Sequence, residues 1–287
     1  MIPPQFDYVK AGSVDEAVSA LAERGDEAKV LAGGQSLIPL LRLRLAYPGT
    51  LVDVGAVEEM RAVRDDGDAI VIGAAVTHAE VIGNSLVQQH APLVVKATET
   101  VADRQVRHRG TFGGSLSHAD PAGDLPSVAV ALDAEFVIAG GGGSRRTVAA
   151  RDFFSDYLQS ILAPDELLVE VRVPKLGDGW GVHYEKFNRV AQAWAVVGVA
   201  AAVQRSNGSI TQARIGLTNM GPTPIRASAV EQALAGGDAT EEAVRTAAMH
   251  AVEGTSPPSD LGGDAEYRRH LVTVLTRRAV LAAAAAR

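Results

Sequence analysis

The chain has 287 residues, which is longer than most single domains and indicates two. Its apolar fraction of 47% is enough for a buried core, and its net charge of −7 comes without any run of Lys or Arg. A nucleic-acid partner is therefore not expected. We also expect a cytoplasmic protein without a membrane span, because no apolar run approaches the roughly 20 residues of a bilayer span and no secretion signal is evident.

The sequence contains no cysteine. This excludes disulfides and thiol catalysis, and it removes the ligands that an iron–sulfur cluster requires. If the protein handles electrons, it must therefore use an organic cofactor, and any metal cluster in the pathway would lie on another chain.

The N-terminal part of the chain predicts the order strand, helix, strand, helix, strand. Ser13 and Glu16 form a capping box that begins a helix, and Gly25 is placed to end it. Strands are predicted at 29–32 and 50–54, with a short helix at 37–43 between them. The glycine pair after the first of these strands therefore lies where open α/β sheets bind ligands.

A second unit is predicted from about residue 56. It begins with a hairpin whose strands, 61–64 and 69–72, flank the turn at Asp66 and Gly67. The remaining elements are a capping box at 77–80, helices at 92–97, 103–108 and 125–132, and strands at 135–139 and 167–173.

The composition changes at 174–179, which is a candidate linker. Beyond it we predict three consecutive strands at 181–187, 195–204 and 210–217, with a turn at 206–208. Helices are predicted at 225–235, 240–252 and 265–286.

Two loops share a glycine pair followed by polar residues, at 32–36 and at 111–115. Glycine pairs let the backbone turn tightly, and concave arrays of N–H groups bind phosphate oxygens. Two such arrays predict a diphosphate held from both sides, and hence a nucleotide cofactor. Ordinary strand-to-helix turns are the alternative, since the chain has 29 glycines. Neither loop fits the dinucleotide fingerprint or the phosphate-binding loop of nucleotide triphosphatases.

No other group of residues indicates catalysis. His118 and Asp120 alone make a poor metal site, because a third ligand is not nearby in the sequence. No serine lies in a nucleophile-elbow pattern, and no general acid or base for a substrate is evident.

Five segments carry a resemblance to a known family: 32–39, 107–116, 118–126, 166–174 and 185–187. In order and spacing they resemble the FAD-binding medium subunit of molybdenum hydroxylases, the group of xanthine dehydrogenase and aerobic carbon monoxide dehydrogenase. The resemblance implies an α+β fold. Residues 1–175 would form the two-lobed FAD-binding domain of the vanillyl-alcohol-oxidase (PCMH-like) type, with lobes of about 1–55 and 56–175. Residues 176–287 would form a C-terminal domain of a three-stranded antiparallel sheet and a helix bundle.

The resemblance also implies a set of FAD-binding residues. They are Ala32, Gly33, Gly34, Gln35, Ser36, Leu37, Thr111, Gly113, Gly114, Ser115, Asp124, Leu168, Lys186 and Trp194. The two loops would hold the diphosphate, and no residue is assigned a catalytic or metal-binding role.

Three of these residues have a second interpretation. Asp124 would accept a hydrogen bond from a cofactor hydroxyl, or cap the helix that starts at Leu125, or do both. Lys186 would carry positive charge towards the flavin, or it would be a solvated surface lysine. Trp194 would lie against the isoalloxazine ring, or it would be a core aromatic. Some relatives of the wider fold attach FAD through a histidine where Gln35 stands here, so we expect non-covalent FAD.

The function implied is that of an electron-transfer subunit. A large subunit would carry the molybdenum cofactor and hydroxylate the substrate, and a small subunit would relay electrons through 2Fe-2S clusters. This chain would pass the electrons through FAD to an external acceptor, within a dimer of heterotrimers. The alternative is a self-contained flavoprotein oxidase or reductase of the same wider fold. The substrate would be chosen in the large subunit, and the acceptor would be NAD, oxygen, or a quinone or dye.

Overall fold

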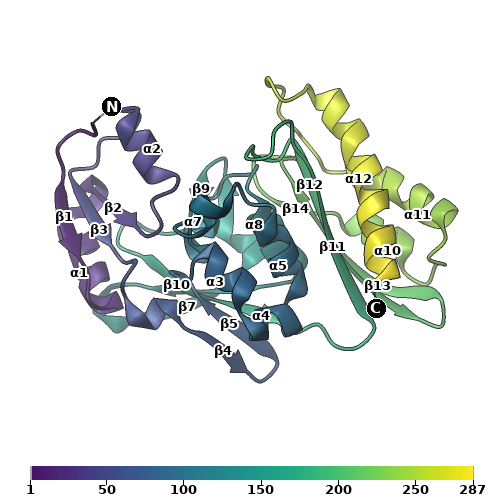
Figure 1. Cartoon of the computed structure of the whole chain (residues 1–287), viewed down its shortest axis with the longest axis horizontal. Coiled ribbons are helices and arrows are strands. Elements are labelled where there is room, and N and C mark those ends of the chain that lie inside the picture. The colour runs from purple at the N-terminus through teal and green to yellow at the C-terminus, as the bar shows by residue number, and fades with distance from the viewer. Residues whose placement is uncertain (1, 287) are drawn as a thin grey trace.

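The three units of the structure are arranged in a row, with lobe one (up to residue 55) at the N-terminal end (Figure 1). The coordinates are a computed structural model that describes residues 2–286. Lobe two (56–175) lies in the middle, and the C-terminal domain (from 176) follows it. No helix within residues 2–286 combines the length and the apolar character needed to cross a membrane.

Lobe one is built on a parallel sheet of order β1-β3-β2. Its elements are β1 (Asp7–Lys10), α1 (Val14–Arg24), β2 (Ala28–Leu31), α2 (Leu37–Arg42) and β3 (Thr50–Asp53). The predicted order of elements is confirmed. The predicted capping box of Ser13 and Glu16 forms only in part. The Ser13 side chain accepts a hydrogen bond from the Glu16 N–H and starts α1, but the Glu16 carboxylate accepts from the N–H of Gly12 instead of that of Ser13. Gly25, at φ +55°, ends the helix as predicted.

Lobe two has an antiparallel sheet of order β4-β5-β10-β6-β7. Its strands are β4 (Val63–Asp66), β5 (Ala69–Gly73), β6 (Glu135–Ala139), β7 (Arg145–Ala149) and β10 (Leu167–Pro174). The strands at 135–139 and 167–173 are confirmed, and so is the hairpin, although its first strand is 63–66 and not 61–64 and its turn lies at Gly67 and Asp68. The capping box at 77–80 is confirmed too, because the Thr77 and Glu80 side chains each accept a hydrogen bond from the other's N–H.

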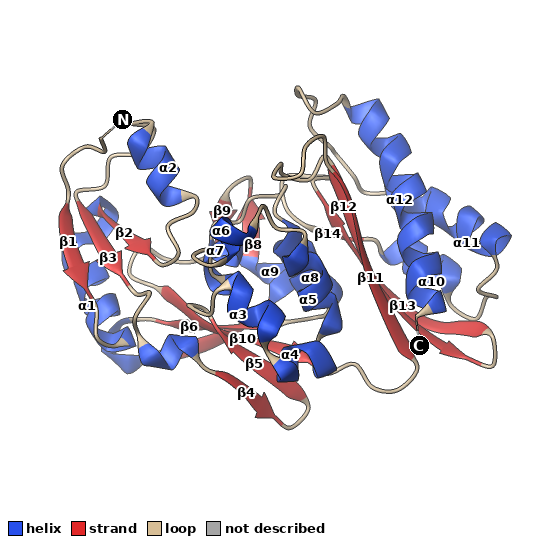
Figure 2. Ribbon diagram, in the orientation of Figure 1, coloured by secondary structure: helices blue, strands red, loops and turns tan. Residues whose placement is uncertain are grey.

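Helices of lobe two gather on one side of this sheet (Figure 2). They are α3 (His78–Gly83), α4 (Ser85–His90), α5 (Pro92–Glu99), α6 (Arg104–Arg107), α7 (Phe112–Ser117) and α8 (Asp124–Ala131). A short helix, α9 (Ala150–Phe153), leads into the hairpin of β8 (Phe154–Asp156) and β9 (Gln159–Ser160). Every residue of α8 is buried, as expected of a helix packed on more than one side.

The C-terminal domain has an antiparallel sheet of order β11-β12-β13-β14. Its elements are β11 (Trp180–Phe187), β12 (Val197–Ser206), β13 (Ser209–Thr218), β14 (Ile225–Arg226), α10 (Ser228–Leu234), α11 (Glu241–Ala248) and α12 (Ala265–Ala285). The three long strands are confirmed. The sequence predicted three strands in this sheet and a helix that begins at residue 225. The structure corrects both points, because the two-residue strand β14 is a fourth strand and the helix begins only after it.

The sheet of the C-terminal domain is buried on both faces. Along β12, Ala200 and Ala202 belong to the core shared with lobe two, whereas Val199 and Ala201 belong to the core formed with the helices. This is the alternation of a strand between two layers. On β13, a Cβ at Gly216 would lie only 2.9 Å from the Ser127 carbonyl carbon. The domain therefore packs directly on the backbone of α8.

Candidate functional site

A cleft of about 620 Å³ lies between the two lobes and the C-terminal domain, within the size range of ligand sites. Every residue predicted to bind the cofactor lines it. They come from the loop at 32–37, from the loop at 111–115, and from four separate positions: Asp124, Leu168, Lys186 and Trp194. Residues more than 150 positions apart in the sequence thus meet at one place, as is typical of a binding site and not of unrelated turns.

The first glycine loop presents a row of free donors to this cleft. No residue within 2–286 accepts a hydrogen bond from the N–H groups of Gly33, Gly34, Gln35, Ser36 or Leu37. The φ of Gly34 is +71°, a conformation that favours glycine, and the loop runs straight into the first turn of α2. The Ser36 side chain makes no capping bond, which leaves its hydroxyl available. Such an array suits an anion with several oxygens.

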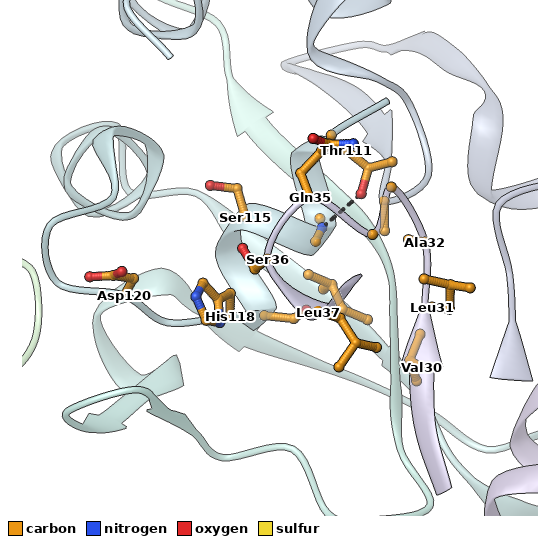
Figure 3. A pocket seen from close by; sticks show the side chains of 18 of the residues that line it. Val30, Leu31, Ala32, Gln35, Ser36, Leu37, Thr111, Ser115, His118 and Asp120 are labelled. Atoms are coloured by element: carbon orange, nitrogen blue, oxygen red, sulfur yellow. Dashed lines mark hydrogen bonds between the residues drawn. The ribbon is translucent and has the colours of Figure 1, made fainter. Parts of the chain in front are cut away.

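The second glycine loop is built differently. The Gly113 N–H donates to the Ala74 carbonyl at 2.9 Å, and the Gly114 N–H donates to the Thr111 hydroxyl at 3.2 Å, drawn as a dashed line in Figure 3. The prediction of a second array of free N–H groups is therefore wrong for these two glycines. This loop presents to the cleft the hydroxyl groups of Thr111 and Ser115 and the backbone of its two glycines, which have no side chains.

The first glycine loop touches lobe two just before the second glycine loop. A Cβ on Gly33 would overlap the Arg109 carbonyl oxygen and would lie 2.7 Å from the Gly110 Cα. Only glycine allows this approach of backbone to backbone. On the second loop, a Cβ on Gly113 would lie 2.6 Å from the Ala74 Cα, so that glycine is required for packing within lobe two.

A buried ion pair forms the wall of the cleft towards the C-terminal domain. The Lys186 Nζ donates to Asp124 Oδ2 at 2.8 Å and to the Thr100 carbonyl at 3.1 Å, with the Lys186 side chain 6% exposed and that of Asp124 4% exposed. Tyr184 Oη donates to the other carboxylate oxygen of Asp124 at 2.8 Å. Burial raises the pKa of the Asp124 carboxyl, and Lys186 and Tyr184 oppose that shift.

The structure excludes the second interpretation of three predicted site residues. Helix α8 begins at Asp124 itself with no side-chain capping bond, so Asp124 is not the cap. Lys186 is buried and is not a solvated surface lysine. Trp194 is 55% exposed and lines the cleft, so it is not a core aromatic. The neighbouring Gln192 donates to the Asp103 carboxylate at 2.6 Å and ties this loop to lobe two.

The sequence interpretation missed two residues of the site. Tyr184 is one, and no local pattern distinguishes it from any inward-facing strand residue. His78 is the other: it lines the cleft, and its buried Nδ1 has no hydrogen-bond partner within residues 2–286. Burial, helped by the nearby Arg107, lowers the pKa of His78 to about 4. No cluster of three or more His, Cys, Asp or Glu side chains within residues 2–286 could hold a metal ion.

Two parts of the chain each match a known protein family. Residues 4–176 match the family described as the FAD binding domain in molybdopterin dehydrogenase. Residues 182–283 match the CO dehydrogenase flavoprotein C-terminal domain.

Individual proteins are similar over the whole chain. The carbon monoxide dehydrogenase medium chain of Hydrogenophaga pseudoflava is 41% identical, over 99% of this chain and 98% of its own length. The 6-hydroxypseudooxynicotine dehydrogenase complex subunit alpha of Paenarthrobacter nicotinovorans is 38% identical, over 97% of this chain and 94% of its own. A solved structure of carbon monoxide dehydrogenase from Hydrogenophaga pseudoflava, 43% identical, superposes with a TM-score of 0.95 and covers 99% of this chain and 98% of that one.

Proposed function

The chain belongs to the FAD-binding medium subunits of the molybdopterin dehydrogenases, of the carbon monoxide dehydrogenase type, and from that premise we propose that FAD binds non-covalently in its cleft. It is thus the flavoprotein subunit of an oxidoreductase. The observation that carries the proposal is the row of free N–H groups at 33–37, which fits a diphosphate and has no other acceptor within residues 2–286.

The cleft residues divide the task of holding FAD. The free N–H groups and the Ser36 hydroxyl would bind one side of the diphosphate, and the Thr111 and Ser115 hydroxyls the other. Ala32, Leu37 and Leu168 would supply apolar contact, and the backbone of Gly113 and Gly114 would line the cleft beside the cofactor. Trp194, which is exposed at the cleft, would cover the isoalloxazine ring. Asp124 would hold a cofactor hydroxyl with the acceptor capacity that Tyr184 and Lys186 leave free.

Bound FAD supplies the redox chemistry, while the protein holds and tunes it. The ammonium group of Lys186 is fixed in the wall of the cleft by Asp124 and Thr100. Asp124 balances the charge of this ammonium group, but the third N–H of Lys186 has no acceptor within residues 2–286, so it would donate to a group bound next to it and favour negative charge there. Lys186 is therefore the residue that we assign to stabilising the reduced, anionic flavin.

The electrons would come from another chain and leave to an external acceptor. This chain has no cysteine, so it cannot ligate an iron–sulfur cluster through thiolates. We infer a small subunit with 2Fe-2S clusters and a large subunit with the molybdenum cofactor, assembled as a dimer of heterotrimers. The relatives support this division by name, since one is called a medium chain and another a subunit of a dehydrogenase complex.

The substrate of the whole enzyme would be chosen by the large subunit. The two relatives are named for carbon monoxide and for 6-hydroxypseudooxynicotine, two molecules of very different size, although each is similar to this chain over nearly its full length. A self-contained flavoprotein oxidase or reductase is the second candidate. It would have to bind an organic substrate in the same cleft, beside Trp194.

Two measurements test the proposal. The chain should bind one FAD per molecule, and denaturation should release the yellow colour into the supernatant, because Gln35 cannot bond covalently to FAD. Yellow colour that stays with the precipitated protein would refute non-covalent binding. Oxidation of an organic substrate by the isolated chain would favour the self-contained oxidase.

A further inference from the structure

A chain of buried hydroxyl groups links the C-terminal domain to the cleft. Tyr184 Oη lies 2.8 Å from Asp124 Oδ1 and 3.1 Å from Thr218 Oγ1, and Thr218 Oγ1 lies 2.6 Å from Ser127 Oγ. All four residues are buried. Tyr184 and Thr218 come from β11 and β13, whereas Asp124 and Ser127 come from α8 of lobe two.

The direction of these hydrogen bonds follows from the donors available. An ionised carboxylate only accepts, so the single O–H of Tyr184 donates to Asp124. Thr218 then donates to Tyr184, and Ser127 donates to Thr218 at 2.6 Å in preference to its other acceptor, the Asp124 backbone carbonyl at 3.2 Å. The hydroxyl groups thus form a relay that runs from α8 through the sheet and back to the carboxylate on α8.

The fold makes room for this relay at one glycine. Gly198 on β12 lies between the two strands that carry the hydroxyls, and a Cβ there would lie 2.5 Å from Tyr184 Oη and 3.0 Å from the Thr218 Cβ. The hydroxyl groups are buried, and hydrogen bonds in such a low-dielectric setting are stronger than at the surface. The relay is therefore a fixed part of the packed domain interface.

The carboxylate at the end of the relay holds the cleft lysine. One carboxylate oxygen of Asp124 accepts a hydrogen bond from Tyr184, and the other accepts one from Lys186. These two residues are two positions apart on the same face of β11. We propose that Tyr184 is a positioning residue of the flavin site, which fixes the Asp124 carboxylate so that Lys186 keeps its place in the cleft wall. This inference rests on the proposed function, because it takes the cleft to be the FAD site.

The pH dependence offers a readout that a merely structural role would not change. The charged and titratable groups that face Asp124 are Lys186 and Tyr184 from β11 and Asp120 from the loop before α8. The Tyr184 hydroxyl holds the pKa of the Asp124 carboxyl down against the effect of burial. Removing this hydroxyl should raise that pKa, so that loss of the carboxylate on acidification begins at a higher pH.

The test measures FAD affinity of the full-length chain by fluorescence titration between pH 5 and 8, together with thermal unfolding without FAD. Tyr184→Phe should raise the FAD dissociation constant about tenfold, the effect expected when a buried carboxylate loses one hydrogen bond. Its affinity should also fall away at a higher pH than in the wild type. Thr218→Val should raise the constant about threefold, whereas Thr218→Ser, which keeps the hydroxyl, should bind as the wild type does. Tyr157→Phe, at an exposed tyrosine, is the control.

The outcomes separate this inference from the proposed function. If Tyr184→Phe lowers the unfolding temperature but leaves the dissociation constant and its pH profile unchanged, the residue is only structural and the inference is wrong. Equal affinities for Thr218→Val and Thr218→Ser would show that the relay does not reach the site, and would also overturn it. If the wild-type chain binds no FAD at any pH, the proposed function fails, and the inference fails with it.

Discussion

The buried ion pair of Lys186 and Asp124 gives the sharpest prediction about stability. Replacing Lys186 with methionine keeps much of the side-chain volume but leaves the Asp124 carboxylate buried without its counter-charge. Breaking a buried pair from one side costs about 3–5 kcal/mol. The matched control is Lys175→Met, since Lys175 pairs at 2.7 Å with Asp65 near the surface. Pairs of that kind contribute about 0–1 kcal/mol.

The pH dependence of this loss follows from the pKa of Asp124. Burial raises this pKa above its unfolded value, and without Lys186 nothing of opposite charge opposes the shift. A group with a raised folded pKa contributes stability that is present below its unfolded pKa and lost as the pH rises through the folded one. The deficit of Lys186→Met should therefore be smallest at acidic pH, where the carboxyl is protonated, and grow as the pH rises through the raised pKa.

Urea unfolding of the ligand-free chain at several pH values measures these free energies. Adding Asp124→Asn to Lys186→Met should recover part of the stability at pH 8, because the uncompensated charge is then gone. The reasoning is refuted if Lys186→Met costs no more than Lys175→Met. It is also refuted if the deficit does not change with pH, or if the double variant is no more stable than the single one.

Two further predictions concern the lobe contact and the buried histidine. Gly33→Ala should weaken FAD binding more than tenfold in a fluorescence titration, because its Cβ would overlap the Arg109 carbonyl and push the lobes apart. Gly141→Ala is the control and should bind as the wild type does, since the space around Gly141 is open. Equal affinity of the two variants would contradict the close contact at Gly33. The folded pKa of His78, about 4, lies below its unfolded value, so its stability contribution should fall by about 3 kcal/mol between pH 6.5 and pH 4. Urea unfolding should show this loss in the wild type and not in His78→Phe, and parallel pH profiles of the two would refute it.

Local patterns were sufficient to predict most of the fold. Capping residues, turn glycines and apolar periodicity are short-range signals, and they placed the elements of lobe one, the hairpin of lobe two and the three long strands of the C-terminal domain. Strand β14 has only two residues, and its pairing with β13 at Gly216 and Leu217 is a tertiary contact without a sequence pattern of its own. The helix predicted from residue 225 therefore begins later.

The candidate site was predictable in its members but not in its connections. Gly33 and Gly113 each belong to a Gly-Gly pair, yet one packs against the opposite lobe and the other has its N–H engaged by Ala74. Which amides remain free depends on segments distant in the sequence. The same holds for Asp124, whose partners Tyr184 and Lys186 lie 60 and 62 positions away. The sequence placed Asp124 and Lys186 in one site without indicating that they bind each other.

Purification of the chain from its native source under non-denaturing conditions tests the central claim most directly. We predict a complex in which this chain carries one dissociable FAD, together with a larger chain that contains molybdenum and a small cysteine-rich chain that contains iron and sulfide. A chain that purifies alone and oxidises an organic substrate without such partners would contradict the account.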